Sequence, residues 1–449
     1  MNANKQKISE LLTYICINKP KGPEARMWWK EGLPGVVLDW DLDMKFAETI
    51  REILREPIVF ENFTVKEIES QLQDIISNGF RWPLSLRQTY VIISVKKMFA
   101  SFYSQIEEYT FVIPIHNLQV VQSFSIGDVT FKNFSEFQRK KWVGVQARII
   151  KNNPHLTKDQ KKSFNNRLKE ELLKPLVGNA CAETKCRARE ERAKEIAFMK
   201  VSTAIDIIKL YCLYGKRASD CVFGLKGEVL VSSIRTVLQL TTSGSPVFTP
   251  TLERIGPLLP LRIERSELKR MQKLGLSKFG KITQNSKKTW VEKKLLRATY
   301  WYSRVLDTPL RRIDDEKIVI KRELMSSLTG ESLEYSCINE RLVKAFVALE
   351  SLFAINKNEA IQNNIAERVA FLLTKDYQER KAIKRFLKDT YDFRSNIVHR
   401  GHTYVSSKEL NRLMNIVRDS IIILMLKRNK LGLKSSEDFY EYFEKQKLS

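Results

Sequence analysis

Apolar residues recur at helical spacing along most of the chain. Residues three and four apart share one face of a helix, and this spacing is present within residues 8–17, 44–105, 289–306 and 342–424. Apolar and polar residues alternate instead over 111–131 and in short runs within 221–256, as in strands with one buried face. The pattern predicts an α+β fold that is mostly α and is divided into several domains.

Capping signals mark where several of these helices begin. Thr64-x-x-Glu67 and Ser406-x-x-Glu409 both have the form of a capping box, in which a hydroxyl and a carboxylate satisfy the first free backbone N–H groups. Asp376-x-x-Glu379 has the same form and precedes an apolar stripe that continues to Phe393. Gly401 follows the stripe, as glycine often follows the last turn of a helix. We therefore expect a helix from Glu379 toward Gly401.

Two stretches combine regular structure with residues that can bind metal. Residues 36–43 alternate like a strand and would place Asp39, Asp41 and Asp43 on one face, but no histidine lies nearby and we expect a solvated face. Residues 180–214 are predicted to form one long helix carrying Cys181 and Cys186. No second ligand pair follows at zinc-finger spacing, so packed thiols are favoured. We expect neither a metal nor another cofactor.

Charge changes this picture more than composition does. The net charge is +25 and the pI is about 9.7, which favours a polyanionic partner. Lys and Arg outnumber Asp and Glu by 17 to 7 in residues 139–200 and by 12 to 3 in residues 262–297. Each stretch is either an RNA-binding surface or an ordinary solvated helix face. The residues expected to bind RNA are Lys287, Lys288, Lys293, Lys294, Arg297 and Arg400.

Charge and pattern together suggest three domains in a cytoplasmic protein. We expect an α+β domain at 1–135, a basic, mainly helical domain with short strands at 136–325, and a helical bundle at 326–449. The longest apolar run, Ile421–Leu426, is too short to span a bilayer, and no cleavable signal is recognisable. Six scattered cysteines fit a reducing compartment. We therefore expect no membrane partner.

The residues most suited to chemistry lie at the end of the predicted helix, in the run 391–401. Arg394 is followed five positions later by His399, one of only four histidines. An imidazole can transfer protons near neutral pH, and a guanidinium can bind phosphate oxygens. On a helix these two residues point roughly 140° apart, with a rise of roughly 7.5 Å. A two-fold dimer with antiparallel helices would bring both pairs into one cleft.

Three segments in order resemble the Apea-like branch of the HEPN superfamily. They are residues 341–353, with Ala-Leu-Glu350; residues 366–373, with Glu-Arg368-Val-Ala; and the ending Arg394-x4-His399-x-Gly. The resemblance covers about residues 331–430. It implies a dimerising helical bundle that cuts RNA without metal, with Arg394 and His399 catalytic and with Ser395 and Asn396 as orienting groups. It also implies a toxin or anti-phage (abortive-infection) role.

Some features leave a second function open. The polar residue after the arginine is often Asn, Asp or His in that family, whereas Ser395 stands here with Asn396 next. The alternative is an inactive bundle kept for dimerisation and RNA binding. Glu350 and Arg368 are expected to form a structural ion pair that supports the bundle. Expected partners are RNA, with tRNA as one candidate, a second copy of the chain, and a phage-derived trigger or inhibitor.

Overall fold

A computed structural model describes most of the chain, which forms two compact units. The described residues are 3–18, 27–30, 33–36, 40–104, 106–115, 118–152, 154, 156–167, 169–170, 174, 177–212, 235–241, 246–251, 261–307, 333–356, 359–400 and 405–447. The first unit comprises Met1–Phe111, Lys185–Phe198 and Gln239–Pro246, and the second comprises the rest. The strand-like runs expected at 221–231, together with Asp39, Gly401 and His402, lie outside the described residues.

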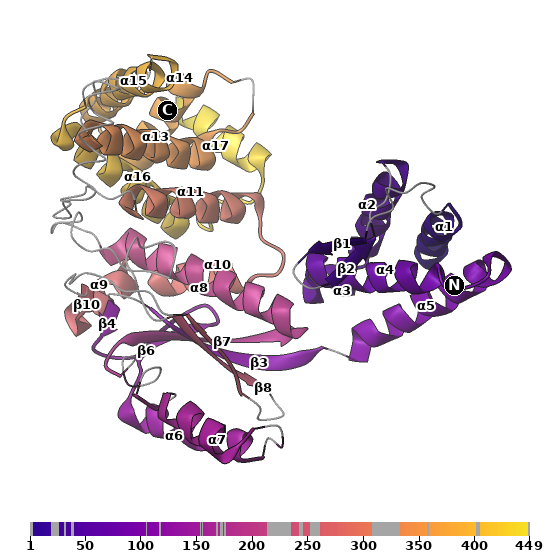
Figure 1. Ribbon diagram of the computed structural model, residues 1–449. Coiled ribbons are helices and arrows are strands. Elements are labelled where there is room, and N and C mark those ends of the chain that lie inside the picture. The colour runs from indigo at the N-terminus through magenta and orange to yellow at the C-terminus, as the bar shows by residue number, and fades with distance from the viewer. Residues whose placement is uncertain are drawn as a thin grey trace. The chain divides into compact units, whose positions relative to one another are not determined.

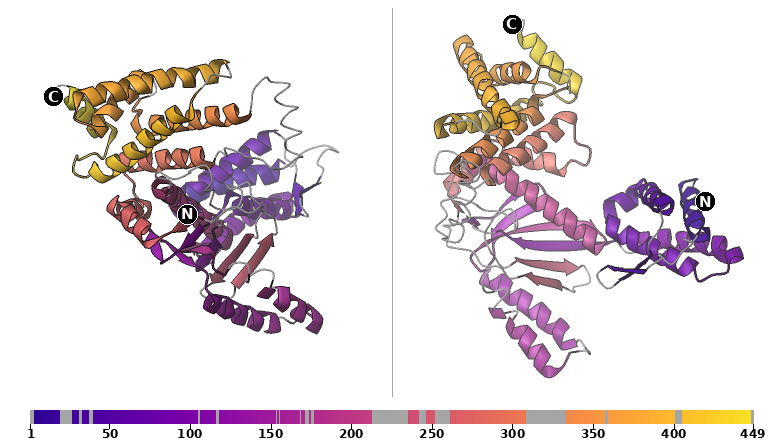
Figure 2. Two further views of the ribbon diagram at one scale, coloured as in Figure 1. Left: turned by 90° about the vertical axis from the view of Figure 1, so that its left-hand side faces the viewer. Right: turned by 45° about the horizontal axis from the view of Figure 1, so that its top comes forward.

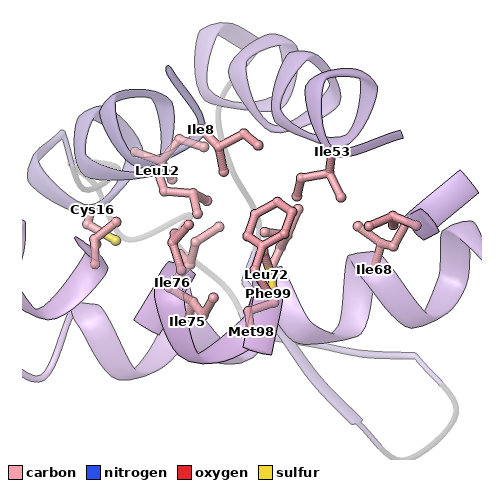
Figure 3. Packing of buried hydrophobic residues seen from close by; sticks show 14 of the residues in the cluster. Ile8, Leu12, Cys16, Ile53, Ile68, Leu72, Ile75, Ile76, Met98 and Phe99 are labelled. Carbon is pink, nitrogen blue, oxygen red and sulfur yellow. The ribbon is translucent and has the colours of Figure 1, made fainter. Parts of the chain in front are cut away.

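Helices build most of the first unit around one apolar core (Figure 3). Side chains of Ile8, Leu12, Ile53, Leu72 and Phe99 converge there and are nearly or wholly buried. The predicted capping box of Thr64 and Glu67 is confirmed. The elements are α1 (Ala3–Ile17), α2 (Trp40–Leu54), α3 (Pro57–Asn62), α4 (Val65–Gly79), α5 (Leu84–Ser104) and the antiparallel hairpin of β1 (Met27–Lys30) and β2 (Leu33–Val36).

The strand predicted for residues 36–43 is wrong over its second half. The described strand β2 ends at Val36, and α2 begins at Trp40, so Asp41 and Asp43 belong to a helix. Leu42 is buried, and Ile53 lies eleven positions further along, on the same side of that helix. Burying apolar residues at helical spacing therefore decided the structure of this segment, although apolar and polar residues alternate over 36–43. The two carboxylates are therefore not on a strand face.

A six-stranded sheet has the strand order β5-β6-β7-β3-β8-β9. The pairs β5–β6 and β6–β7 are antiparallel. Phe131 of β6 lies opposite Phe124 of β5 and opposite Ala182 of β7. Parts of β3, β7, β8 and β9 belong to each unit. The strands are β3 (Glu107–Pro114), β5 (Phe124–Ile126), β6 (Val129–Asn133), β7 (Ala180–Ala188), β8 (Arg235–Thr241) and β9 (Pro246–Thr251), and a parallel pair joins β4 (Leu118–Val120) to β10 (Leu261–Ile263).

The long helix predicted for residues 180–214 is also wrong in its first part. Residues Ala180–Ala188 form strand β7, and the helix α8 (Glu190–Cys212) starts only after it. Lys132 of β6 lies 2.6 Å from Glu183 of β7, so a cross-strand ion pair supports the pairing. Cys181 and Cys186 are five positions apart on the strand and therefore face opposite sides of the sheet. Both thiols are buried, and burial raises the pKa of Cys181 to about 12.

Helices complete the second unit beside the sheet. Two of them are α9 (Arg265–Lys273) and α10 (Leu276–Gln284), with Gly275 at the start of α10 and Gly280 within it. Gly280 is required because a Cβ there would lie 2.7 Å from the backbone nitrogen of Gly127. Gly280 therefore allows close packing of α10 against the backbone at Gly127. Two further helices, α6 (Glu136–Asn152) and α7 (Lys158–Asn166), pack against each other.

The C-terminal part of the second unit is a helical bundle, coloured from orange to yellow in Figure 1 and seen from two other sides in Figure 2. Helix α13 packs against α11, α14, α15 and α16. Its predicted stripe of Leu342, Phe346, Leu349 and Phe353 is buried, and the capping box of Ser406 is confirmed. The helices are α11 (Trp290–Asp307), α13 (Leu333–Phe353), α14 (Ile361–Leu373), α15 (Tyr377–Arg400), α16 (Ser407–Lys427) and α17 (Ser436–Lys447).

The described helices and strands agree with a mostly helical α+β chain. None of the helices in the described ranges combines the length and the apolar character needed to cross a bilayer. The division into domains at 135 and 325 stays a prediction.

Candidate functional site

Helix α15 carries the candidate site and continues beyond the predicted stripe to Arg400. At its start, an Asp376 carboxylate oxygen accepts a hydrogen bond of 2.8 Å from the backbone nitrogen of Glu379. The Glu379 carboxylate accepts instead from the Thr374 hydroxyl, at 2.6 Å, so only half of the expected capping box forms. Leu387 and Thr390 are buried and fix which side of the helix faces the bundle. Arg394 and His399 therefore lie on one unbroken helix.

Arg394 is held on the side of α15 that faces α13. Its Nη2 atom lies 3.4 Å from Oε1 of Glu350, and its guanidinium carbon lies 5.4 Å from the ring centroid of Tyr391. The Tyr391 hydroxyl donates to the same carboxylate oxygen at 3.2 Å. Burial raises the pKa of Tyr391, and the nearby Glu350 carboxylate adds to this. The side chain of Arg394 is nevertheless 23% exposed. Among the described residues its charged partner is Glu350, and the side chain keeps an exposed side.

The ion pair predicted between Glu350 and Arg368 is wrong. Arg368 pairs with Glu359, at 2.8 Å between Nη2 and Oε2, and also donates to the Phe353 carbonyl at 2.7 Å. Glu359 precedes α14, and its carboxylate accepts from the backbone nitrogen of Ile355 at 2.6 Å. Because Glu359 lies in the connection between α13 and α14, its carboxylate can bind both the backbone that follows α13 and the side chain of Arg368. Apolar periodicity carries no signal for a connection residue, so the sequence analysis missed Glu359.

His399 lies on a different side of α15 from Arg394. Its side chain is exposed, and the structure gives it no hydrogen bond to any residue that it describes. A separation of five positions on a helix turns the two side chains roughly 140° apart. Ser395 and Asn396, between them, are partly buried. Within one protomer the helix therefore does not bring the arginine and the histidine together.

The basic residues expected to bind RNA divide into two groups. Lys287, Lys293 and Arg297 are exposed. Lys288 donates to the Asn285 carbonyl at 2.8 Å, and the half-buried Lys294 donates to the carbonyl of Ala354.

Burial lowers the pKa of Lys294, and its ammonium also lies 4.7 Å from the ring centroid of Trp290. Lys294 therefore joins α11 to the end of α13. For Arg400, the side chain lies outside the described residues.

Two side chains of α15 are suited to chemistry at a phosphate. Over the residues that the structure describes, no group of three or more His, Cys, Asp or Glu side chains is arranged to hold a metal. Arg394 and His399 offer a fixed positive charge and a proton-transfer group. These are suited to a reaction at a phosphate ester.

Compared with family models, with curated proteins and with solved structures, the chain matches none of them. The likeness of residues 331–430 to the HEPN superfamily therefore rests on the three segments quoted above. This likeness leads us to expect RNA cleavage, and the positions of Arg394 and His399 on α15 define the variants that test it.

Proposed function

We propose that the protein is a metal-independent endoribonuclease of the HEPN type, with its active site built from α15 of two protomers. The observation that carries the proposal is the arrangement of α15 itself. One continuous helix presents an exposed His399 and an Arg394 oriented by Glu350 and Tyr391. A guanidinium has five N–H donors, and the pair with Glu350 uses only part of them. The remaining N–H groups on the exposed side can donate hydrogen bonds to phosphate oxygens.

The reaction needs only groups that this helix and the substrate provide. The 2′-hydroxyl of RNA attacks the adjacent phosphorus, and its proton passes to a base. The bond from phosphorus to the 5′-oxygen breaks, and the leaving oxygen takes up a proton. His399 transfers a proton in one of these steps, while Arg394 stabilises negative charge on the phosphoryl oxygens. The products carry a 2′,3′-cyclic phosphate and a free 5′-hydroxyl. DNA lacks the attacking hydroxyl and should resist cleavage.

The splay of Arg394 and His399 is the reason for invoking a second copy. A two-fold axis crossing α15 near Asn396 would set Arg394 of one protomer close to His399 of the other. Ser395 and Asn396 would then lie at the crossing and could orient the substrate. A protomer on its own would be a poor catalyst.

We assign RNA binding to the basic residues of 287–297, and expect the exposed ones among them to contribute most. Lys287, Lys293 and Arg297 are exposed and suited to phosphate contacts. Lys288 and Lys294 are engaged within the protein, so their contribution to RNA binding should be smaller. The cellular role that the family likeness supports is that of a cytoplasmic toxin or anti-phage effector acting on RNA such as tRNA, controlled by a phage-derived trigger or inhibitor.

A second candidate function is favoured by one specific contact. The ion pair of Arg394 with Glu350 also fits an arginine that only stabilises the bundle. In that case α15 would serve dimerisation and RNA binding without catalysis. The two functions differ in whether His399 matters, because His399 makes no hydrogen bond to a described residue and contributes nothing obvious to the fold.

The deciding experiment is RNA cleavage by the purified protein in EDTA. The proposal predicts cleavage with 2′,3′-cyclic phosphate products, and a loss of roughly 10²–10⁴ in rate for His399→Ala with the folding midpoint unchanged. His402→Ala is the matched control and should cut like the parent. Parental rates for His399→Ala, or a requirement for a divalent ion, would favour the non-catalytic function.

A further inference from the structure

A basic groove lies on the first half of α15, away from the residues assigned above. It has a volume of about 440 Å³ and is lined by Gln378, Lys381, Arg385, Phe386 and Asp389 of α15 and by Arg412 of α16. Three cations thus face one carboxylate. Lys381, Arg385 and Arg412 are all exposed. The groove is a surface feature rather than part of the bundle core.

Two contacts give the groove its form. The guanidinium carbon of Arg412 lies 4.3 Å from the ring centroid of Phe386, so α16 places its arginine over an aromatic ring on α15. This cation–π contact limits the positions of the guanidinium, and none of its N–H groups is hydrogen-bonded to another described residue. Arg385 lies 3.8 Å from Asp389, but both side chains are highly exposed, at 85% and 64%, so this pair holds Arg385 only weakly.

The chemistry of the groove favours a phosphodiester over a protein surface. Arginine edges match the oxygens of a phosphate, and a net positive groove attracts a polyanion. Protein interfaces usually centre on buried apolar anchors, whereas Phe386 is the only large apolar side chain among the lining residues. That ring is already covered by Arg412 on one side.

The groove lies on the side of α15 that carries Asn396 and His399, and Arg394 lies on the opposite side. Gln378, Arg385, Asp389 and Asn396 are separated by seven, four and seven positions, a spacing that keeps them on one helix face. Arg385 precedes His399 by fourteen residues, or about 21 Å at the rise of an α-helix. A strand of RNA bound in the groove could therefore extend along the helix to His399.

We propose that this groove binds the phosphate backbone of single-stranded RNA beside the cleaved bond, and that it is a subsite separate from the catalytic pair. That the neighbouring bond is cleaved rests on the proposed function, but binding of RNA in the groove does not need catalysis. In the two-fold arrangement with its axis near Asn396, one groove would flank each side of the shared cleft. The substrate class is then an unpaired stretch long enough to reach from the cleft into a groove.

The test reverses charge in the groove and at matched positions elsewhere. Arg385→Glu with Arg412→Glu is compared with Lys430→Glu and Lys434→Glu, two exposed lysines outside the groove lining. Both double variants change the net charge by the same amount. Binding of a single-stranded RNA is measured against salt concentration. The groove variant should bind about tenfold more weakly, and its salt slope should fall by about 1.4, as expected for two lost phosphate contacts. The control variant should stay close to the parent.

Short substrates separate this inference from the proposed function. A dinucleotide cannot reach from His399 to the groove, so the groove variant should cut it with the parental kcat/KM. On long RNA the same variant should lose activity because its KM rises. If the parent cuts no RNA but the groove variant still loses binding, the proposed function fails and the groove assignment stands. If the parent cuts RNA and both double variants bind it equally, the groove assignment is overturned. A milder variant, Lys381→Gln with Arg412→Gln, repeats the test should charge reversal impair folding.

Discussion

Two arginines of the bundle, Arg368 and Arg394, each pair with a glutamate but in opposite settings. Arg368 is 4% exposed, and it donates to both the Glu359 carboxylate and the Phe353 carbonyl at distances of 2.7–3.1 Å. The side chain of Arg394 is 23% exposed and lies 3.4 Å from Glu350, while its Nε atom is buried without a hydrogen-bond partner among the described residues.

The difference indicates two kinds of task. A buried guanidinium bound to a carboxylate and a carbonyl, such as that of Arg368, cannot reach a ligand and is costly to remove. The guanidinium of Arg394 is partly exposed and makes one long ion pair with a described residue, so it has N–H donors left for a ligand, and the neighbouring Tyr391 ring restrains its orientation. This contrast supports the proposal that Arg368 serves stability and Arg394 serves the chemistry. The variants below test the proposed division, in order of their expected effect on stability.

Removing Arg368 should have the largest effect. Arg368→Ala leaves the Glu359 carboxylate buried without its charged partner, and breaking such a pair costs about 3–5 kcal/mol. Chemical denaturation of the purified variant measures this. Arg385→Ala, with a side chain that is 85% exposed, is the matched control and should change stability by about 0.5 kcal/mol or less. Equal effects at the two positions would refute the division.

Acid titration sharpens the same contrast. Burial tends to raise the pKa of Glu359, but hydrogen bonds from Arg368 and the Ile355 backbone outweigh it, so the pKa is lowered. A lowered pKa contributes stability above the value of the unfolded chain, near 4.5, and this stability is lost as the pH falls through the folded pKa. The stability difference between the parent and Glu359→Gln should therefore narrow on acidification. A difference that widens would contradict the assignment.

Arg394→Ala should cost much less stability and much more activity. Losing a partly exposed ion pair and a cation–π contact costs about 1–2 kcal/mol. Removal of a preorganised charge at the reacting phosphate lowers kcat by roughly 10²–10³. Denaturation and single-turnover RNA cleavage measure the two effects on the same preparation. A large loss of stability with cleavage retained would make Arg394 a structural residue like Arg368.

Glu350→Gln should have the smallest effect on stability, about 0.5 kcal/mol, because glutamine is the same size and still accepts from the Tyr391 hydroxyl. In the proposed site, the Glu350 carboxylate positions Arg394 without touching the substrate. We expect kcat to fall while KM stays near the parental value, and Glu350→Asp to recover part of the loss. Cleavage at the parental rate by Glu350→Gln would show that Arg394 needs no partner to be oriented.

Much of the architecture was predictable because it follows from local signals. The capping boxes at Thr64 and Ser406 form as expected, and the apolar stripes of α13 and α16 are buried. These features depend on neighbouring residues along one helix. Strand β7 was missed because its alanines, glutamate and lysine are compatible with a helix, and pairing with β6 decides the outcome.

In the candidate site too, local sequence predicts some features and the tertiary fold decides the others. The positions of Arg394 and His399 on one helix follow from apolar spacing, and so does their divergence. The partners of the arginines do not, because they depend on which carboxylate the tertiary fold brings near. Glu350 meets Arg394 and Tyr391 of α15, while Glu359, in a connection without periodicity, meets Arg368. The groove residue Arg412 likewise comes from a second helix.

The most direct test of the composite site is a mixed dimer. One protomer carries Arg394→Ala and the other His399→Ala, and two different affinity tags allow purification of the heterodimer alone. If Arg394 of one protomer acts with His399 of the other, the heterodimer keeps one intact pair. It should then cut RNA in EDTA at up to about half the parental rate, while both variant homodimers remain nearly inactive. A heterodimer as inactive as either homodimer, beside an active parent, would contradict the shared site.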